Sequence, residues 1–226
     1  NEEVSFEPKQ DLKKNFSYTR DIYNHVIHPM LSDYQYKVFL SRIIVGDKTL
    51  DAKPNLPVIP DDLPERAKNI ALKYAPVFNI FKNYRGDIVT GDTSGTSAFA
   101  LPPYNCVDIV TYLGGSIPLA IGAYLAGFKN VWAISGDFGF ISAGMIGLTE
   151  ALQREIPLKI MIFYNKQAAA TGGQRIDKKI LRHILAGFER FIVHISNPND
   201  PFEIENVFKE VSAINELRII IVDFPD

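Results

Sequence analysis

A regular alternation of short apolar runs with helical segments constrains the fold of this chain more than any other feature. Five runs are rich in β-branched and aromatic residues: DIVT, NVWAIS, LKIMIFY, RFIVHI and RIIIVD. They are continuously apolar, as strands of a parallel sheet are when helices cover both faces. The alternation therefore predicts an α/β domain with a doubly wound parallel sheet. In such a sheet, ligands bind beyond the carboxyl ends of the strands.

The pattern gives expected positions for each element. We expect strands over residues 87–90, 130–135, 158–164, 190–195 and 218–223, and helices near 65–83, 114–127, 143–154, 177–187 and 201–216.

A proline-rich stretch marks the expected domain boundary. Prolines stand at positions 54, 57, 60 and 64, which is typical of an extended linker. We expect an N-terminal extension with this linker over residues 1–64 and the α/β domain over residues 65–226. The polar N-terminal sequence NEEVSFEPKQDLKK is unlike a signal peptide, and it lacks an initiator Met, as a processed or shortened chain would.

Composition argues against several classes of protein. Lys and Arg number 24 against 26 Asp and Glu, a balance that gives no electrostatic reason to bind nucleic acid or a membrane surface. No apolar run reaches the roughly 18 to 20 residues of a membrane span.

The single cysteine, Cys106, cannot by itself hold an iron–sulfur cluster or form an internal disulfide. We expect a small buried hydrophobe at Cys106 and a cytoplasmic protein. The pair His25 and His28 has no third metal ligand nearby, so a surface or core pair is the expectation.

The string Asp137-Phe138-Gly139 has the letters of the magnesium loop of protein kinases. A kinase also needs a His-Arg-Asp catalytic loop upstream, and this tripeptide occurs nowhere in the chain. The segment before Asp137 is an expected parallel strand, which is the wrong context. The sequence therefore excludes a kinase.

Two oxygen-bearing side chains follow two successive expected strands. Asp137 comes after the run 130–135, between Gly136 and Gly139, and Asn165 follows the run 158–164. Oxygen ligands, glycines that let the backbone approach an anion, and a helix N-terminus together describe a site for Mg²⁺ and a diphosphate. Each residue also has an ordinary alternative, because Asp often caps a helix and Asn often occupies a turn.

These residues resemble the thiamine diphosphate fingerprint GDG…N, with Phe138 in place of the third glycine. The stretch GDTSGTSAFALPPYNCVDIVTYLGGSIPLAIG, residues 91–122, is similar to the diphosphate-binding domain of indolepyruvate:ferredoxin oxidoreductases and related 2-oxoacid oxidoreductases. ATGGQ, residues 170–174, resembles the TGGQ of pyruvate:ferredoxin oxidoreductases. The resemblance covers about residues 86–200, half of the chain.

The resemblance implies a set of metal- and cofactor-binding residues and leaves the catalytic residues unknown. It implies that Asp137, Asn165 and the backbone carbonyl of Gln167 are Mg²⁺ ligands. It also implies that the cofactor thiamine diphosphate lies against Gly91, Asp92, Gly114, Gly115, Ser116, Gly136, Asp137, Phe138, Gly139, Asn165, Gln167, Thr171 and Gly172.

The sequence departs from the family in one segment. Relatives carry a Cys-Pro-Gly-Cys-Pro-His-like stretch ahead of the helix expected at 65–83, where this chain has LPVIPDDLPERA. The substrate end of the site is therefore altered or supplied differently. The family also activates its cofactor with a carboxylate on a separate pyrimidine domain, and about 85 residues before the motif region are too few for a second domain of typical size. We expect that domain, and any electron-accepting cluster, on a partner chain or another part of the protein.

Three functions remain open. The resemblance implies a diphosphate-binding subunit or domain of a 2-oxoacid oxidoreductase, with an aryl pyruvate as a possible substrate, ferredoxin as acceptor and an oligomeric assembly. The second is a subunit of a non-oxidative thiamine diphosphate-dependent 2-oxoacid decarboxylase. The third is a catalytically silent domain of the same fold.

Overall fold

Six parallel strands form one sheet in the computed structural model, which describes residues 65–101, 103–168 and 172–225. The strand order is β2-β1-β3-β4-β6-β5. The strands are β1 (Ile88–Asp92), β2 (Ile109–Thr111), β3 (Val131–Gly136), β4 (Lys159–Tyr164), β5 (Ile192–Ile195) and β6 (Arg218–Asp223). The predicted doubly wound α/β fold is thus confirmed. The extension and linker expected over residues 1–64, including His25 and His28, lie outside the described residues.

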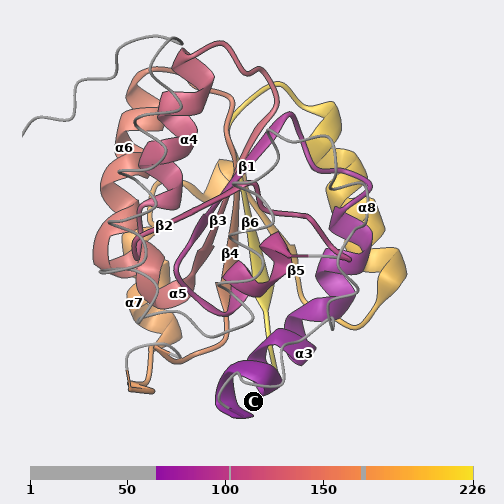
Figure 1. Cartoon of the computed structure of the whole chain (residues 1–226). Helices are drawn as coiled ribbons and strands as arrows, with labels where there is room; N and C mark the ends of the chain where they lie inside the picture. Colours follow the sequence, from indigo (N-terminus) through magenta and orange to yellow (C-terminus); the bar gives the residue numbers. More distant parts are fainter. Residues whose placement is uncertain (1–64, 102, 169–171, 226) are drawn as a thin grey trace, which may run out of the picture. The chain divides into compact units, whose positions relative to one another are not determined.

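Helices cover both faces of the sheet (Figure 1). One face carries α3 (Glu65–Phe81) and α8 (Pro201–Ala213), and the other carries α4 (Ser116–Leu125), α6 (Met145–Gln153) and α7 (Lys178–Ile184). Each face has its own hydrophobic core, because alternate residues of every buried strand point to opposite sides. In β3, for example, Trp132 and Ile134 join the core under α3 and α8, whereas Val131 and Ala133 join the core under α4 and α6.

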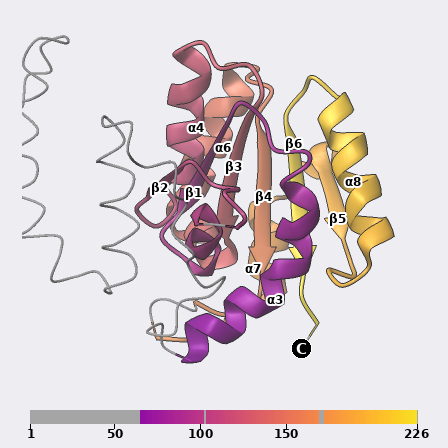
Figure 2. The ribbon, with the colours of Figure 1, turned by 45° about the vertical axis from the view of Figure 1, so that its right-hand side comes forward.

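Stacked aromatic rings hold α3 against the sheet. The ring of Phe78 stacks on Phe99 at 3.9 Å and on Phe163 of β4 at 5.2 Å. All three side chains are at most 2% exposed, so burial of their rings is a major contribution to this face of the domain. Figure 2 shows the consequence for the site: α3 passes close to the carboxyl end of β4.

The helix after β3 begins earlier than the sequence pattern predicts. It starts at Asp137 with α5 (Asp137–Gly139), widens into the π-type turn η4 (Phe140–Gly144) and continues without a break into α6. Gly136 has extended backbone angles and is the N-cap of this helix. Asp137 is therefore the first helical residue, at the end where backbone N–H groups lack intrahelical partners. The sequence pattern misses the start of this helix because the π-type turn η4 interrupts the 3.6-residue periodicity.

Three short elements were not predicted: β2, η3 and the 3-10 helix η6 (Glu189–Phe191) just before β5. The edge strand β2 is three residues long and its side chains are exposed or half-buried, so it lacks the apolar run that marks the other strands. The 3-10 helix η3 (Gly95–Ala100) follows β1 and is capped by Ser94, whose hydroxyl accepts from the backbone N–H of Thr96. Within the described residues, no helix is long and apolar enough to span a membrane.

Candidate functional site

Asp137 lies buried at the junction of β3 and the helix that follows it. Its side chain is 1% exposed. Oδ1 accepts a hydrogen bond from the backbone N–H of Phe138 at 2.7 Å, and Oδ2 accepts one from the backbone N–H of Lys166 at 2.8 Å. Because β3 and β4 are neighbours in the sheet, the turn after β4 reaches this carboxylate. The sequence-predicted pair Asp137 and Asn165 therefore belongs to one site.

Burial dominates the electrostatics of the Asp137 carboxylate. Burial raises the pKa of Asp137 from its ordinary value of 3.8 to about 6, although backbone hydrogen bonds from Phe138 and Lys166 act in the opposite direction. No positively charged side chain in the described part of the chain contributes to this shift. A buried anion in this state gains from a bound metal ion, which would favour its charged form. The donor set therefore fits a hard cation.

Asn165 is held at both ends of its amide. Its Nδ2 donates to the hydroxyl of Tyr74 at 2.6 Å, and its Oδ1 accepts from the backbone N–H of Gln167 at 3.1 Å. Lys166 between them has a positive φ of 66°, which turns the chain sharply after β4. An amide oxygen has two lone pairs, so Oδ1 can accept this bond and still bind a cation.

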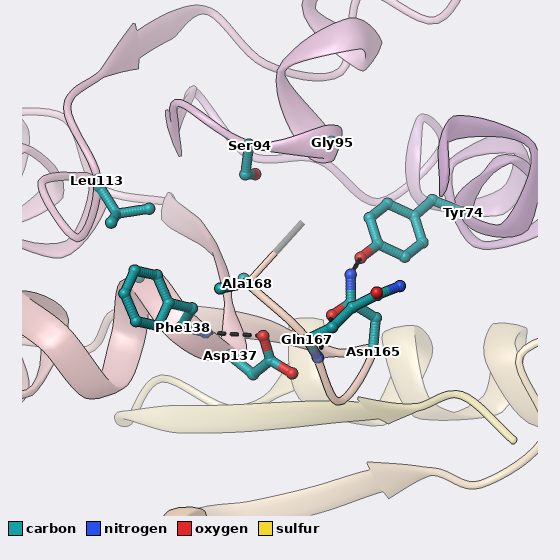
Figure 3. Close-up of a pocket in the computed structure, with 11 residues that line it drawn as sticks. Tyr74, Ser94, Gly95, Leu113, Asp137, Phe138, Asn165, Gln167 and Ala168 are labelled. Carbon is teal, nitrogen blue, oxygen red and sulfur yellow. Dashed lines mark hydrogen bonds between the residues drawn. The ribbon is translucent and has the colours of Figure 1, made fainter. Parts of the chain in front are cut away.

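A small cavity lies between these residues (Figure 3). Its volume is about 30 Å³, the space of one water molecule or one cation. Six of the residues predicted from the sequence line it: Gly136, Asp137, Phe138, Gly139, Asn165 and Gln167. Within the described residues, no group of three His, Cys, Asp or Glu side chains is placed to hold a metal. The cavity thus offers one carboxylate, one amide and backbone groups.

Two glycines shape this cavity in different ways. A Cβ at Gly136 would meet no atom within 4 Å, so glycine leaves the space beside Asp137 open. A Cβ at Gly139 would lie 2.5 Å from Oδ2 of Asp92 and 3.3 Å from the backbone N of Gly114. Gly139 therefore permits the close approach of three segments at the first turn of the helix. Open space at Gly136 and close packing at Gly139 fit an anion held at the helix N-terminus.

Asp92, in contrast, does not line the cavity. It is fully buried, and its Oδ1 accepts from the backbone N–H of Ser116 at 2.8 Å while its Oδ2 accepts from the hydroxyl of Ser135. It therefore ties the end of β1 to the start of α4 and to β3. The remaining predicted residues, Gly91, Gly114, Gly115, Ser116 and Gly172, also lie outside the cavity lining, and Thr171 is outside the described residues.

Gly114 nevertheless packs against a residue that lines the cavity. Gly114 has a φ of +78°, and a Cβ there would lie 2.7 Å from the carbonyl oxygen of Gly139. The hydroxyl oxygen of Ser116 is buried, and no described residue forms a hydrogen bond with it. The turn before α4 thus packs directly on the first turn of the helix that begins at Asp137.

Five residues that line the cavity were missed by the sequence reasoning: Tyr74, Ser94, Gly95, Leu113 and Ala168. Of these five, Tyr74 could have been suspected from the sequence. It belongs to the buried stripe of α3 with Ile70, Ala71, Val77 and Phe78, and a buried tyrosine needs a partner for its hydroxyl. The sequence could not show that this partner is Asn165.

A site at the carboxyl ends of neighbouring parallel strands, with a helix N-terminus beside it, is the arrangement of α/β cofactor-binding domains. The family comparison specifies the class. A model of the thiamine pyrophosphate enzyme C-terminal TPP binding domain matches residues 90–209, and the chain belongs to this family. No curated protein matches the chain significantly.

Several solved structures are similar to the chain at low sequence identity. A 2-oxoglutarate:ferredoxin oxidoreductase from Magnetococcus marinus is 10% identical, with a TM-score of 0.54 over 76% of this chain and 68% of that chain. A benzoylformate decarboxylase from Polynucleobacter necessarius is 13% identical, with a TM-score of 0.49 over 75% of this chain and 34% of its own. A transketolase from Campylobacter jejuni is 11% identical, with a TM-score of 0.46; the match covers 70% of this chain and 37% of the transketolase chain. The chain spans about a third of the length of the latter two.

Proposed function

We propose that this chain is the diphosphate-binding subunit or domain of a thiamine diphosphate- and Mg²⁺-dependent 2-oxoacid oxidoreductase. The observation that carries the proposal is the pairing of Asp137 and Asn165 across an ion-sized cavity at the start of a helix. In this proposal Asp137, the Oδ1 atom of Asn165 and the carbonyl of Gln167 hold Mg²⁺. Few protein ligands suffice, because Mg²⁺ completes its oxygen shell with water and phosphate.

The protein's part in this chemistry is to bind and orient. In this proposal the backbone N–H of Gly139 binds the diphosphate, and that of Phe138 joins it when Oδ1 of Asp137 turns from this N–H to the cation. The open space at Gly136 admits the diphosphate. When bound, thiamine diphosphate supplies the carbon nucleophile and the electron sink for decarboxylation of a 2-oxoacid. In this proposal the carboxylate that activates the cofactor comes from a pyrimidine domain on a partner chain, on a second subunit or on another part of the protein.

A second, larger hollow adjoins the cation cavity at Gln167. It has a volume of about 370 Å³ and is otherwise lined by Glu65, Asn69, Ile70 and Lys73 of α3. This volume is in the range of small-molecule sites. The hollow lies at the start of α3. In relatives the Cys-Pro-Gly-Cys-Pro-His-like segment comes just before this helix. We assign the substrate end of the site to this hollow, with Lys73 and Asn69 available to a carboxylate.

The oxidative reaction is favoured by the ordered motifs of residues 91–122. The Magnetococcus marinus protein, which shares the fold, is itself a ferredoxin oxidoreductase with 2-oxoglutarate bound. The non-oxidative decarboxylase remains the second candidate, because Cys106, the chain's one cysteine, is fully buried and leaves this chain without cluster ligands. Ferredoxin, or a partner that bears a cluster, is required only by the first candidate.

A turnover experiment separates the candidates. The full chain, with any chain that co-purifies, is supplied with thiamine diphosphate, Mg²⁺ and a panel of 2-oxoacids that includes aryl pyruvates. Reduction of ferredoxin or a viologen dye together with CO₂ release is the expected result. CO₂ release without dye reduction would establish the non-oxidative decarboxylase. Cofactor binding without turnover of any substrate would establish a silent domain.

A further inference from the structure

Tyr74 reaches the site from outside the segment that matches the family model. It lies on α3, whereas the match begins at residue 90. Its ring packs against Phe163 at 4.5 Å and Phe224 at 4.9 Å, and its side chain is 2% exposed. A Cβ added to Gly95 would lie 3.4 Å from its Cε2 atom, so η3 closes over the ring edge. The ring is therefore fixed on several sides.

The hydroxyl of Tyr74 holds one end of the Asn165 amide. The 2.6 Å hydrogen bond from Nδ2 occupies the donor end, and the Gln167 N–H at 3.1 Å occupies one lone pair of Oδ1 (Figure 3). A flipped amide would place its NH₂ group against the Gln167 N–H, donor against donor. The two contacts therefore fix both the rotamer and the orientation of the amide. Among the residues that the structure describes, Oδ1 accepts no second hydrogen bond, so its second lone pair can bind a cation.

We infer that Tyr74 is a positioning residue that orients Asn165 so that its Oδ1 atom binds the cation beside Asp137. This inference rests on the proposed function, because it assumes the Mg²⁺ site. Groups that orient metal ligands usually change metal affinity by 10- to 100-fold when they are removed.

The test compares two variants that each delete one buried phenol hydroxyl. Tyr74→Phe keeps the ring packing and removes the bond to Asn165. Tyr164→Phe is the matched control, because Tyr164 is equally buried, does not line the cavity, and donates its hydroxyl to the backbone carbonyl of Ile176 at 3.3 Å rather than to Asn165. Mg²⁺ is titrated calorimetrically, in the presence of thiamine diphosphate, into the full chain with any chain that co-purifies. We expect Tyr74→Phe to weaken Mg²⁺ binding about tenfold or more and Tyr164→Phe to change it less than about twofold.

A second readout needs no cofactor. The side-chain amide signal of Asn165 in ¹⁵N NMR spectra is assigned by its loss in Asn165→Asp. We expect this signal to shift clearly further in metal-free Tyr74→Phe than in Tyr164→Phe, a difference that a general loss of stability would not produce.

The possible failures are distinguishable. Equal Mg²⁺ affinity in Tyr74→Phe and wild type, or an unmoved Asn165 signal, would overturn the positioning role and leave the proposed function intact. Wild-type protein that binds no Mg²⁺ with thiamine diphosphate would overturn the proposed function and the positioning role together.

Discussion

The backbone N–H of Lys166 donates to Oδ2 of Asp137 at 2.8 Å and so ties the turn after β4 to the helix after β3. Two segments that are distant in sequence become one site through this contact. The bond supports the ionised form of Asp137, yet burial outweighs it and the pKa rises to about 6.

The raised pKa predicts how stability changes with pH in the metal-free protein. A carboxyl group whose pKa is higher in the folded state binds its proton more tightly there, so its contribution is fully present below about pH 4 and is lost as pH rises through about 6. We expect the free energy of unfolding of wild type to lose on the order of 2 to 3 kcal/mol over this window through Asp137. Urea unfolding of wild type and Asp137→Asn between pH 4 and pH 7, about the window above, measures it. Equal pH slopes in the two proteins would contradict the burial argument.

Close packing at Gly139 predicts opposite effects for two Gly→Ala substitutions. The new Cβ at position 139 would lie 2.5 Å from Oδ2 of Asp92, and Asp92 is held by its bonds to Ser116 and Ser135. We expect Gly139→Ala to lower the free energy of unfolding by about 1 to 3 kcal/mol. Gly122→Ala, in α4 with nothing within 4 Å, is the control and should raise it by about 0.5 to 1 kcal/mol. Urea unfolding of both variants measures the two changes in the free energy of unfolding. If Gly122→Ala destabilises the protein as much as Gly139→Ala does, the contacts at Gly139 are not the cause.

Asp92 is predicted to act as a structural link. It is fully buried and accepts two hydrogen bonds, whereas the exposed Asp87 accepts two backbone bonds of 3.2 Å from Lys129 and Asn130. Loss of a buried carboxylate leaves its donors without partners, and loss of an exposed one lets water replace it. We expect Asp92→Ala to cost about 2 to 4 kcal/mol and Asp87→Ala about 1 kcal/mol or less in chemical unfolding. A cost at Asp92 no larger than that at Asp87 would contradict this role.

Cys106 is predicted to be inert in the folded protein. Its side chain is fully buried beneath α3, with the carbonyl oxygen of Phe78 at 3.7 Å from Sγ, and burial raises the pKa of its thiol to about 12. Thiolates rather than thiols react with disulfide reagents. We expect no reaction with Ellman's reagent near pH 8, the usual assay condition, until denaturant unfolds the domain. Rapid labelling of the native protein would show that α3 opens readily.

The fold was predictable because strands buried on both faces leave a plain apolar pattern. β1, β3, β4, β5 and β6 all stand where the runs predict them to within a few residues. The edge strand β2 lacks that pattern, since its side chains are exposed. The start of the helix at Asp137 was missed because the π-type turn η4 disturbs the periodicity.

The site was predictable only where it follows from strand order. Asp137 and Asn165 come after neighbouring parallel strands, and this alone brings them together. Tyr74 lies 91 residues before Asn165 and meets it through the packing of α3, which no local pattern encodes. For Asp92 the sequence gives the position but not the partners of the side chain. A carboxylate at the end of β1 can face a ligand or the neighbouring segments, and in the structure it accepts hydrogen bonds from Ser116 and Ser135.

The central claim is that Asp137 holds Mg²⁺ for the diphosphate of thiamine diphosphate. Calorimetric titration of thiamine diphosphate, with and without Mg²⁺, into wild type and Asp137→Ala tests it most directly, with the chain alone and with any chain that co-purifies. The account predicts binding that requires both Mg²⁺ and Asp137. Binding that is unchanged in Asp137→Ala, or absent from wild type under all these conditions, would contradict it.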